Sequence, residues 1–312
     1  MIAKESKQPI LVTGAHRSGT TWVGKMLAAD RGTAYISEPL NVLHRPGVFR
    51  IPVNYWYPYI CIDNEPDYYN EFQETLAFRY HLKTEINAIH SRKDTLRMGR
   101  DLVSFFLGRI FKKRPLLKDP FAMFSAPWFS NRLDCKIVIT VRHPAAFVSS
   151  LKRLNWPFLF SNLLGQPLLM NDLLKSFRDE MEQQDRKPED ILGGASLLWK
   201  IIYSTVKVYQ EKYPDFIVIR HEDLSKNPLE GFHSLYTSLG LTFNQQVERK
   251  IFQSSGSENP RELAKKNTHS VRLNSQANLD NWKKRLDSNE LDRIRTQTEE
   301  ITEYFYPDFT WD

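Results

Sequence analysis

Apolar residues in this chain follow two alternating patterns: short continuous runs, and longer stretches in which they recur every three or four positions. Short runs bounded by polar or turn residues are typical of buried β-strands, and the wider spacing is typical of helices with one apolar face. We therefore expect strands at Ile10–Thr13, Ala34–Ser37, Leu116–Lys118, Lys136–Val141 and Phe216–Arg220. The helical spacing occurs at Thr20–Ala29, Glu71–Arg92, Asp101–Lys112, Ala145–Leu154, Gly194–Tyr213, Leu229–Leu239 and Asn289–Tyr304.

Strands that alternate with helices predict an α/β fold in which helices cover both faces of a central parallel sheet, giving three layers. Ligands of such folds bind at the carboxyl ends of the strands. Residues capable of chemistry follow each of the expected strands, and we expect them to line one edge of the sheet: Gly14–Gly19, Glu38, Asp119, Arg142 and His221.

The first strand leads into Thr13-Gly-Ala-His-Arg-Ser-Gly-Thr-Thr-Trp22, which predicts a phosphate-binding loop. Gly14 and Gly19 permit a tight turn that points backbone N–H groups and the N-terminus of the next helix into one concavity. Arg17 adds a cation, and hydroxyl donors come from Ser18, Thr20 and Thr21. The glycine spacing is that of nucleotide-hydrolysing P-loops, but Thr20 stands in place of their lysine, which argues against ordinary nucleoside triphosphate hydrolysis.

A second motif, Lys136-Ile-Val-Ile-Thr-Val-Arg-His-Pro-Ala-Ala-Phe-Val-Ser-Ser150, joins the fourth expected strand to a helix. Arg142 ends the β-branched run, and Pro144 opens the helix that carries Ser150. An arginine can donate two hydrogen bonds to a phosphate, and Ser150, two turns along the helix, can direct its hydroxyl to the same group.

These two motifs resemble the 5′-phosphosulfate loop and the 3′-phosphate motif of sulfotransferases that use 3′-phosphoadenosine-5′-phosphosulfate (PAPS). The resemblance extends from about Pro9 to Asp308 and is nearer to carbohydrate, tyrosylprotein and soluble bacterial members than to cytosolic aryl sulfotransferases. It implies a P-loop-like fold, transfer of a sulfuryl group to a hydroxyl without a metal, and 3′-phosphoadenosine 5′-phosphate (PAP) as product. It also implies that the donor is bound by His16, Arg17, Ser18, Gly19, Thr20, Thr21, Trp22, Arg142 and Ser150.

The same resemblance indicates the catalytic groups. Lys118, in Leu116-Leu-Lys-Asp-Pro120, corresponds to a strand-end lysine that approaches the sulfuryl group, but the histidine of the Lys-x-His pattern is missing. Tyr35-Ile-Ser-Glu-Pro-Leu40 resembles the Glu-Pro element of carbohydrate and protein-tyrosine members, which implies Glu38 as the base and favours a glycan-like acceptor. Arg17 and Lys118 would stabilise the negative charge on the departing nucleotide. Substitutes for the base are His44, His16 and Asp119.

Two later segments support the resemblance more loosely. Ile217–Pro228 resembles the family's late strand and turn, with His221 where cytosolic members place an aromatic residue against adenine, and Trp22 is a second candidate for that contact. Ala277–Leu286 resembles the closing Trp-Lys/Arg element. The upstream Arg-Lys-Gly triplet that binds the 3′-phosphate in cytosolic members is absent, and its replacement is left open among Lys265, Lys266 and Arg272.

Composition narrows the class of protein. The 312 residues carry a net charge of +6, which suits an enzyme that binds an anionic nucleotide and is low for a nucleic-acid binder. The basic clusters are expected to be solvated: Lys112-Lys113-Arg114, Lys265-Lys266 and Lys283-Lys284-Arg285. Only Cys61 and Cys135 occur, so we expect a reducing, cytoplasmic location. No linker or membrane-spanning run is evident, and we expect one domain over residues 1–312.

Two aromatic-rich stretches, Asn41–Tyr69 and Asn155–Pro188, are candidates for an acceptor-binding wall or for loops that fold back on the core. Two other functions stay open. A P-loop nucleotide or small-molecule kinase would need Mg²⁺ and normally a lysine in place of Thr20. A regulator that binds PAP without turnover would not depend on Glu38.

Overall fold

Five short runs of mostly buried residues form the central sheet of the computed structural model, which describes residues 8–262, 271–308 and 311. The strands are β1 (Ile10–Gly14), β2 (Thr33–Ser37), β3 (Arg114–Lys118), β4 (Lys136–Val141) and β5 (Ile217–Arg220). Every pairing is parallel, and the strand order is β2-β3-β1-β4-β5. The strands predicted from the sequence and the α/β class are confirmed.

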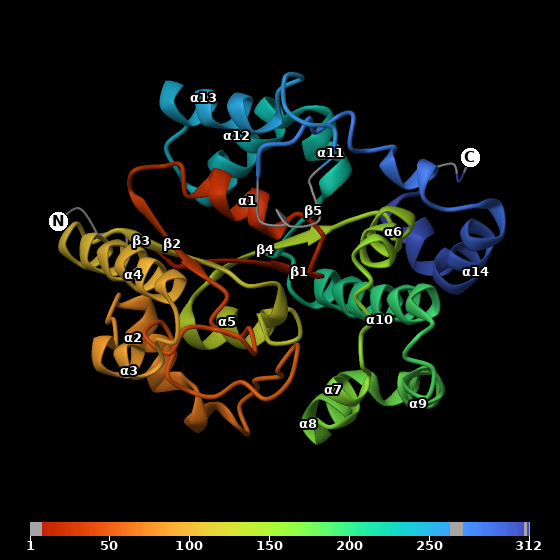
Figure 1. The fold of residues 1–312 in the computed structure, drawn as a ribbon, viewed down its shortest axis with the longest axis horizontal. Helices are drawn as coiled ribbons and strands as arrows, with labels where there is room; N and C mark the ends of the chain where they lie inside the picture. The colour runs from red at the N-terminus through yellow and green to blue at the C-terminus, as the bar shows by residue number, and fades with distance from the viewer. Residues whose placement is uncertain (1–7, 263–270, 309–310, 312) are drawn as a thin grey trace.

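Helices connect the strands and flank the sheet (Figure 1). Between β1 and β3 they are α1 (Thr20–Leu27), α2 (Tyr69–Leu76), α3 (Leu82–Asn87) and α4 (Arg92–Ile110). Between β3 and β5 they are α5 (Ala126–Leu133), α6 (Pro144–Leu154), α7 (Ser161–Leu164), α8 (Pro167–Leu169), α9 (Arg178–Asp185) and α10 (Ile191–Lys212). The remaining helices are α11 (His221–Lys226), α12 (Pro228–Leu239), α13 (Gln245–Ser255) and α14 (Ser288–Phe305), and the short 3-10 turn η5 (Asn281–Lys284) precedes α14.

Alternate residues of the strands divide the core into two layers. Leu11 on β1 packs in the cluster that includes α5, α6 and α10, whereas its neighbours Ile10 and Val12 pack against α1, α12 and α13. Successive side chains of a strand point to opposite faces, so each apolar run buries both faces of the sheet at once. The result is the expected three-layer arrangement, in which α1, α12 and α13 lie on one side and α5 and α10 on the other (Figure 1).

Strand register brings the carboxyl ends of the strands together. Gly14 pairs with Thr140, Ser37 with Lys118, and Val141 with Arg220, so the last residues of adjacent strands lie side by side. The residues that follow these strands therefore share one edge of the sheet. This confirms the predicted placement of the glycine loop, Glu38, Asp119, Arg142 and His221.

The single helix expected over Glu71–Arg92 is wrong, and the helix expected from Asp101 begins earlier. The chain leaves α2 after Leu76 and turns through Phe78, which is buried and adopts a left-handed φ of 55°. Ser91 then caps α4 by accepting a hydrogen bond from the Asp94 amide. Local capping and a buried turn thus override the apolar spacing that runs through both segments.

The two aromatic-rich stretches pack against each other. The Trp56 amide donates to Asn162 Oδ1 at 3.0 Å, and the Tyr59 amide donates to Gln166 Oε1 at 2.8 Å. The segment between α6 and α10 contains the short helices α7, α8 and α9. These hydrogen bonds fix the loop that follows β2 against that helical segment.

Helix α10 is long and apolar enough to cross a membrane by length and composition. However, 72% of the relevant window is buried inside the fold, and its residues belong to the core beneath the sheet. Buried core helices of soluble proteins commonly have this composition.

His143, at the start of α6, is 1% exposed, and its ring stacks on Trp282 with 6.0 Å between the ring centroids. Burial lowers the pKa of His143 to about 3 from its ordinary value of 6.5. Between these values the unfolded chain binds a proton that the folded chain does not. The free energy of unfolding therefore decreases as pH falls from 6.5 toward 3.

Through His143, the wild-type protein should lose about 2 kcal/mol of unfolding free energy between about pH 7 and pH 5, since one proton contributes about 1.4 kcal/mol per pH unit below 6.5. We expect His143→Phe to lack this part of the loss. Urea unfolding at the two pH values measures this difference. The exposed His90 supplies the matched control, His90→Phe, which should retain the wild-type pH dependence. A wild-type pH dependence in His143→Phe would show that His143 is not held neutral in the fold.

Candidate functional site

The loop between β1 and α1 can form only with glycine at two positions. Gly14 and Gly19 have φ values of +139° and +98°. A Cβ at Gly14 would lie 2.5 Å from the Thr140 carbonyl oxygen, and one at Gly19 would lie 2.5 Å from His221 Nδ1. The tight turn directs the chain into α1, whose first N–H groups are free of helical partners, as at any helix N-terminus. The predicted anion-binding loop is thus present in its backbone form.

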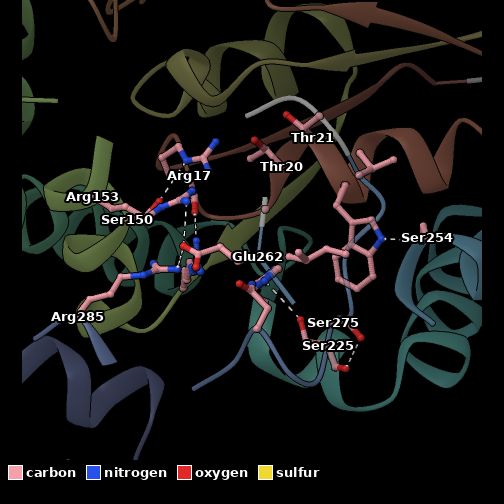
Figure 2. Close-up of a pocket in the computed structure, with 17 residues that line it drawn as sticks. Arg17, Thr20, Thr21, Ser150, Arg153, Ser225, Ser254, Glu262, Ser275 and Arg285 are labelled. Carbon is pink, nitrogen blue, oxygen red and sulfur yellow. Dashed lines mark hydrogen bonds and ion pairs between the residues drawn. The ribbon is translucent and has the colours of Figure 1, made fainter. Parts of the chain in front are cut away.

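The side chains of this loop divide between its two faces. Arg17 has a left-handed φ of 66° and lines the hollow drawn in Figure 2, together with Gly19, Thr20 and Thr21. Ser18 is buried, and its hydroxyl donates to the Ala15 carbonyl at 2.5 Å and shares a hydrogen bond of 2.6 Å with Thr140 Oγ1. Its amide also donates to the Ala15 carbonyl at 3.1 Å. Ser18 therefore holds the loop together from beneath, because both of its donors are used there.

Four arginines line this hollow. Arg17 comes from the loop, Arg142 follows β4, Arg153 lies near the end of α6, and Arg285 follows η5. Arg142 Nη1 donates to the Arg17 carbonyl at 2.8 Å, and Arg17 Nε donates to Ser150 Oγ at 3.3 Å. Burial, and then the charges of the other three arginines, lower the pKa of Arg17 to about 10. Arg17 stays mainly protonated at neutral pH, so this end of the hollow is strongly positive.

One carboxylate lies between two of these arginines (Figure 2). Glu262 Oε1 is 2.9 Å from Arg153 Nη1 and 2.6 Å from Arg285 Nη2. The two arginine side chains are only 16% and 18% exposed, whereas Glu262 is 45% exposed. Two nearly buried guanidinium groups thus hold a single anionic oxygen, which is the arrangement that a phosphate oxygen requires.

The other end of the hollow is lined by rings and apolar side chains. Trp22 Nε1 donates to Ser254 Oγ at 2.9 Å, and the Trp22 ring meets the His221 ring edge-on with 5.7 Å between the centroids. Burial lowers the pKa of His221 to about 3, so its ring is neutral at physiological pH. Val271 and Leu273 add apolar surface. Flat, neutral walls of this kind suit a planar base, with nearby hydroxyls for a ribose: Ser225, Ser254 and Ser275.

Glu38 and Lys118 form an ion pair at the carboxyl ends of β2 and β3. The Lys118 side chain is 2% exposed and that of Glu38 is 20% exposed. Asn41 Nδ2 donates to the second Glu38 oxygen at 2.6 Å, and the Glu38 amide donates to the Lys118 carbonyl at 2.9 Å. Burial alone would lower the pKa of Lys118, but Tyr35 and Glu38 reverse this and raise it. The carboxylate is therefore held at a fixed position beside a permanent cation.

Asp119 lies directly behind this pair. Burial and the Glu38 charge raise the pKa of Asp119 to about 7. Its two oxygens accept hydrogen bonds from the Leu40 amide at 2.6 Å and the Phe121 amide at 3.0 Å. Asp119 thus anchors the chain on either side of Glu38, and it is only 1% exposed.

The two histidines considered as substitute bases are both tied to neighbouring groups. The Tyr57 hydroxyl shares a hydrogen bond of 2.6 Å with His16 Nδ1 and accepts one from the His16 amide at 2.9 Å. Burial and then the Arg17 charge lower the pKa of His16 to about 4. His44 Nδ1 is 2.8 Å from the Asn41 carbonyl oxygen, and burial lowers its pKa.

The structure brings most of the predicted donor-binding residues together around one hollow: Arg17, Gly19, Thr20, Thr21, Trp22, Arg142, Ser150 and His221. Glu38, Lys118, His16 and Ser18 do not line it. Arg272 is exposed and does not line it either, although its neighbours Val271 and Leu273 do. Lys265 and Lys266 lie outside the described residues.

Two lining arginines were missed by the sequence interpretation. Arg153 lies three residues after Ser150, a spacing that places both on one face of α6, and this spacing could have indicated it. Arg285 belongs to a cluster expected to be solvated, but it lines the hollow and pairs with Glu262. Arg114 also departs from that expectation, because it is 7% exposed and donates to the Gln8 and Leu239 carbonyls, each at 2.5 Å.

The sequence of this chain matches the model of one protein family. The model of the sulfotransferase family matches residues 9–245 of this chain, which include the loop, Glu38, Lys118, Arg142 and His221. No curated protein matches the sequence.

Solved structures with a similar chain course are also sulfotransferases. The sulfotransferase domain of the olefin synthase from Synechococcus PCC 7002 is 14% identical, with 98% of each chain covered and a TM-score of 0.49. Mouse sulfotransferase SULT7A1, solved with PAP, is 15% identical, with 95% of this chain and 84% of that chain covered and a TM-score of 0.47. Sulfotransferase STF1 from Mycobacterium tuberculosis H37Rv is 16% identical, with 78% and 70% covered and a TM-score of 0.40. The family assignment rests on the match of the family model to residues 9–245.

Proposed function

The chain belongs to the sulfotransferase family, and we propose that it transfers a sulfuryl group from PAPS to a hydroxyl acceptor, the hydroxyl of a glycan. The observation that carries the proposal is the arginine-lined hollow that opens beside the glycine loop at the carboxyl edge of the sheet. It combines positive charge at one end with flat, neutral walls at the other, as a phosphorylated nucleoside requires.

The residues around the hollow divide between the two ends of the donor. The loop amides and Arg17 would bind the 5′-phosphosulfate, because the α1 N-terminus and a guanidinium both favour an anion there. Arg142, Ser150, Arg153 and Arg285 would bind the 3′-phosphate, which would replace the Glu262 carboxylate between two of them. Trp22 and His221 would form the wall against which the adenine lies.

The transfer needs a base on one side of sulfur and cations on the other. Glu38 would accept the acceptor proton, the acceptor oxygen would then form the bond to sulfur, and the bond from sulfur to the bridging phosphate oxygen would break. Negative charge develops on that oxygen as PAP leaves, and Arg17 and Lys118 would stabilise it. A fixed carboxylate beside a buried ammonium suits both tasks, since neither group must be brought in from solvent.

The proposed glycan acceptor rests on Glu38 and on exposed rings near the loop. Trp156 is 43% exposed, and its ring lies 6.0 Å from the Arg17 guanidinium. Tyr55, 37% exposed, belongs to the aromatic-rich stretch that packs against the segment carrying Trp156. Aromatic faces stack on sugar rings, and they stack equally on a phenol. A phenol, lipid or secondary metabolite is therefore the second acceptor class to be screened.

A kinase is disfavoured by Thr20, which replaces the lysine of P-loop kinases. Among the described residues, Glu71, Glu74 and His81 bring possible metal ligands within 4.8 Å of one another. None of these lines the hollow, and Arg50 forms ion pairs with both carboxylates. We propose a metal-independent enzyme that works as one domain in the cytoplasm, where its two unpaired cysteines would stay reduced.

Calorimetric titration without metal tests the donor. We expect PAP to bind at least about tenfold more tightly than ADP, because each charge-assisted contact to the additional 3′-phosphate contributes roughly 1.5–3 kcal/mol. ATP with Mg²⁺ is the comparison for the kinase, and tighter binding of that nucleotide would overturn the proposal. Transfer of labelled sulfate from PAPS to a panel of sugars and phenols then separates an enzyme from a non-catalytic regulator.

A further inference from the structure

The outward face of α4 carries large apolar side chains that nothing in the described chain covers. Leu96, Val103, Leu107 and Ile110 follow a spacing of seven, four and three residues, which places them in one stripe along the helix. Their exposed fractions are 77%, 55%, 39% and 55%. Phe106, at 61%, and Phe111, at 66%, flank the stripe near its C-terminal end. Isolated exposed apolar residues are common, but five on one helix and a sixth directly after it mark an interaction surface.

Helix α4 and the three residues that follow it carry most of the excess positive charge of the protein. Residues 92–113 contain seven Lys or Arg residues and two Asp residues, a net charge of +5 in a chain whose total is +6. The exposed cations among them are Arg92, Lys93, Arg97, Arg100, Arg109 and Lys112.

Both acidic residues of this segment are neutralised within the protein. Asp94 pairs with Arg45 at 2.9 Å, and Asp101 pairs with Arg100 at 2.8 Å. Their side chains are only 18% and 16% exposed, because both point toward the side of the helix that packs on the protein. The outward face therefore combines apolar and basic residues without an exposed carboxylate from α4.

We propose that this face docks on an anionic lipid surface. A helix that lies in the plane of a membrane needs apolar side chains to enter the headgroup region and basic side chains to contact anionic lipids, and α4 has both on one face. Phe105 and Gly108 bury the opposite side of α4, so the helix can present this face without leaving the fold. Helix α4 lies at the periphery, beside the β2 edge of the sheet (Figure 1), where a flat surface can reach it.

Charge decides between this partner and two others. A second copy docked through the same face would bring like-charged helices together, and no acidic stripe is present on α4 to offset the repulsion. A nucleic acid would satisfy the cations but would leave the apolar stripe in water. An anionic bilayer satisfies both kinds of side chain.

Sedimentation of the full chain with lipid vesicles tests the proposal. We expect it to sediment with phosphatidylcholine vesicles that contain phosphatidylserine, to stay in solution with phosphatidylcholine alone, and to be released by added salt. Lys93→Gln/Arg97→Gln should weaken vesicle binding about 25-fold, from roughly fivefold for each cation. Val103→Ser/Ile110→Ser/Phe111→Ser should weaken it at least about tenfold, because three apolar side chains leave the interface.

The matched control lies on α13, where Arg249, Lys250 and Phe252 are also exposed. Arg249→Gln/Lys250→Gln/Phe252→Ser should retain wild-type vesicle binding, and circular dichroism establishes that every variant is folded. The proposal is overturned if the wild type does not bind anionic vesicles, or if the α4 and α13 variants bind them equally well. It is also overturned if the α4 substitutions convert a dimer to a monomer in light scattering, which would assign this face to a second copy.

Discussion

Glu38→Gln is expected to lower kcat about 10²–10⁴-fold, the usual contribution of a positioned general base. Glutamine preserves the size of the side chain and can still accept a hydrogen bond from Asn41, but it cannot take the proton of an acceptor hydroxyl. Because Glu38 does not line the donor hollow, PAP affinity should stay within about twofold of wild type. Steady-state rates with labelled PAPS and calorimetry with PAP measure the two quantities.

The neighbouring carboxylate provides the control for this experiment. Asp119 is 1% exposed, and its oxygens are used by two backbone amides, so Asp119→Asn is expected to lower stability more than the catalytic rate of the folded enzyme. If folded Asp119→Asn loses turnover while Glu38→Gln retains it, the base is Asp119. A PAP complex of normal affinity combined with equal rates in Glu38→Gln and wild type would remove Glu38 from the mechanism.

Arg142→Ala is expected to weaken PAP binding about 10²-fold or more, since a buried charge-assisted contact to a phosphate contributes roughly 1.5–3 kcal/mol and Arg142 also positions the loop. Its Nη1 donates to the Arg17 carbonyl, so the substitution would remove one of the proposed phosphate ligands and loosen a second one. Burial lowers the pKa of Arg142, and the charge of nearby Glu222 offsets part of this lowering. Calorimetry with PAP measures the loss.

A second nucleotide separates binding of the 3′-phosphate from general damage to the site. AMP lacks that phosphate, so Arg142→Ala should weaken AMP binding much less than PAP binding. Arg142→Lys keeps the charge but loses the two-pronged geometry, and an intermediate PAP affinity is expected. Equal losses for PAP and AMP would show that Arg142 acts only by supporting the loop.

The ion pair between Glu38 and Lys118 has a consequence for the proposed reaction. Lys118 donates to one Glu38 oxygen. If Lys118 turns toward the sulfuryl group when the donor binds, that Glu38 oxygen would become available to an acceptor hydroxyl. Lys118 would therefore affect the rate in two ways, by holding Glu38 in place and by stabilising the departing nucleotide. Lys118→Met should lower kcat even if it does not change PAP affinity.

The sequence by itself determined the elements whose information is local. Each strand is a short apolar run that must be buried on both faces, so β1 to β5 were found within a few residues. The glycine loop was equally accessible, because Gly14 and Gly19 have backbone conformations and close contacts that other residues cannot adopt. The position of the site at the carboxyl edge of the sheet followed from the strands and the loop together, since parallel strands end on the same side of the sheet.

Tertiary structure decided what depends on segments distant in the chain. The break between α2 and α4 follows from a buried turn at Phe78, and the apolar spacing carries no trace of it. Arg153 and Arg285 are separated by more than a hundred positions and meet only where α6 packs against η5. Local sequence can assign a charge to a residue, but whether that charge faces water or a ligand depends on which distant elements cover it. The exposed apolar stripe of α4 was hidden for the same reason, because spacing predicts an apolar face without saying that the face stays uncovered.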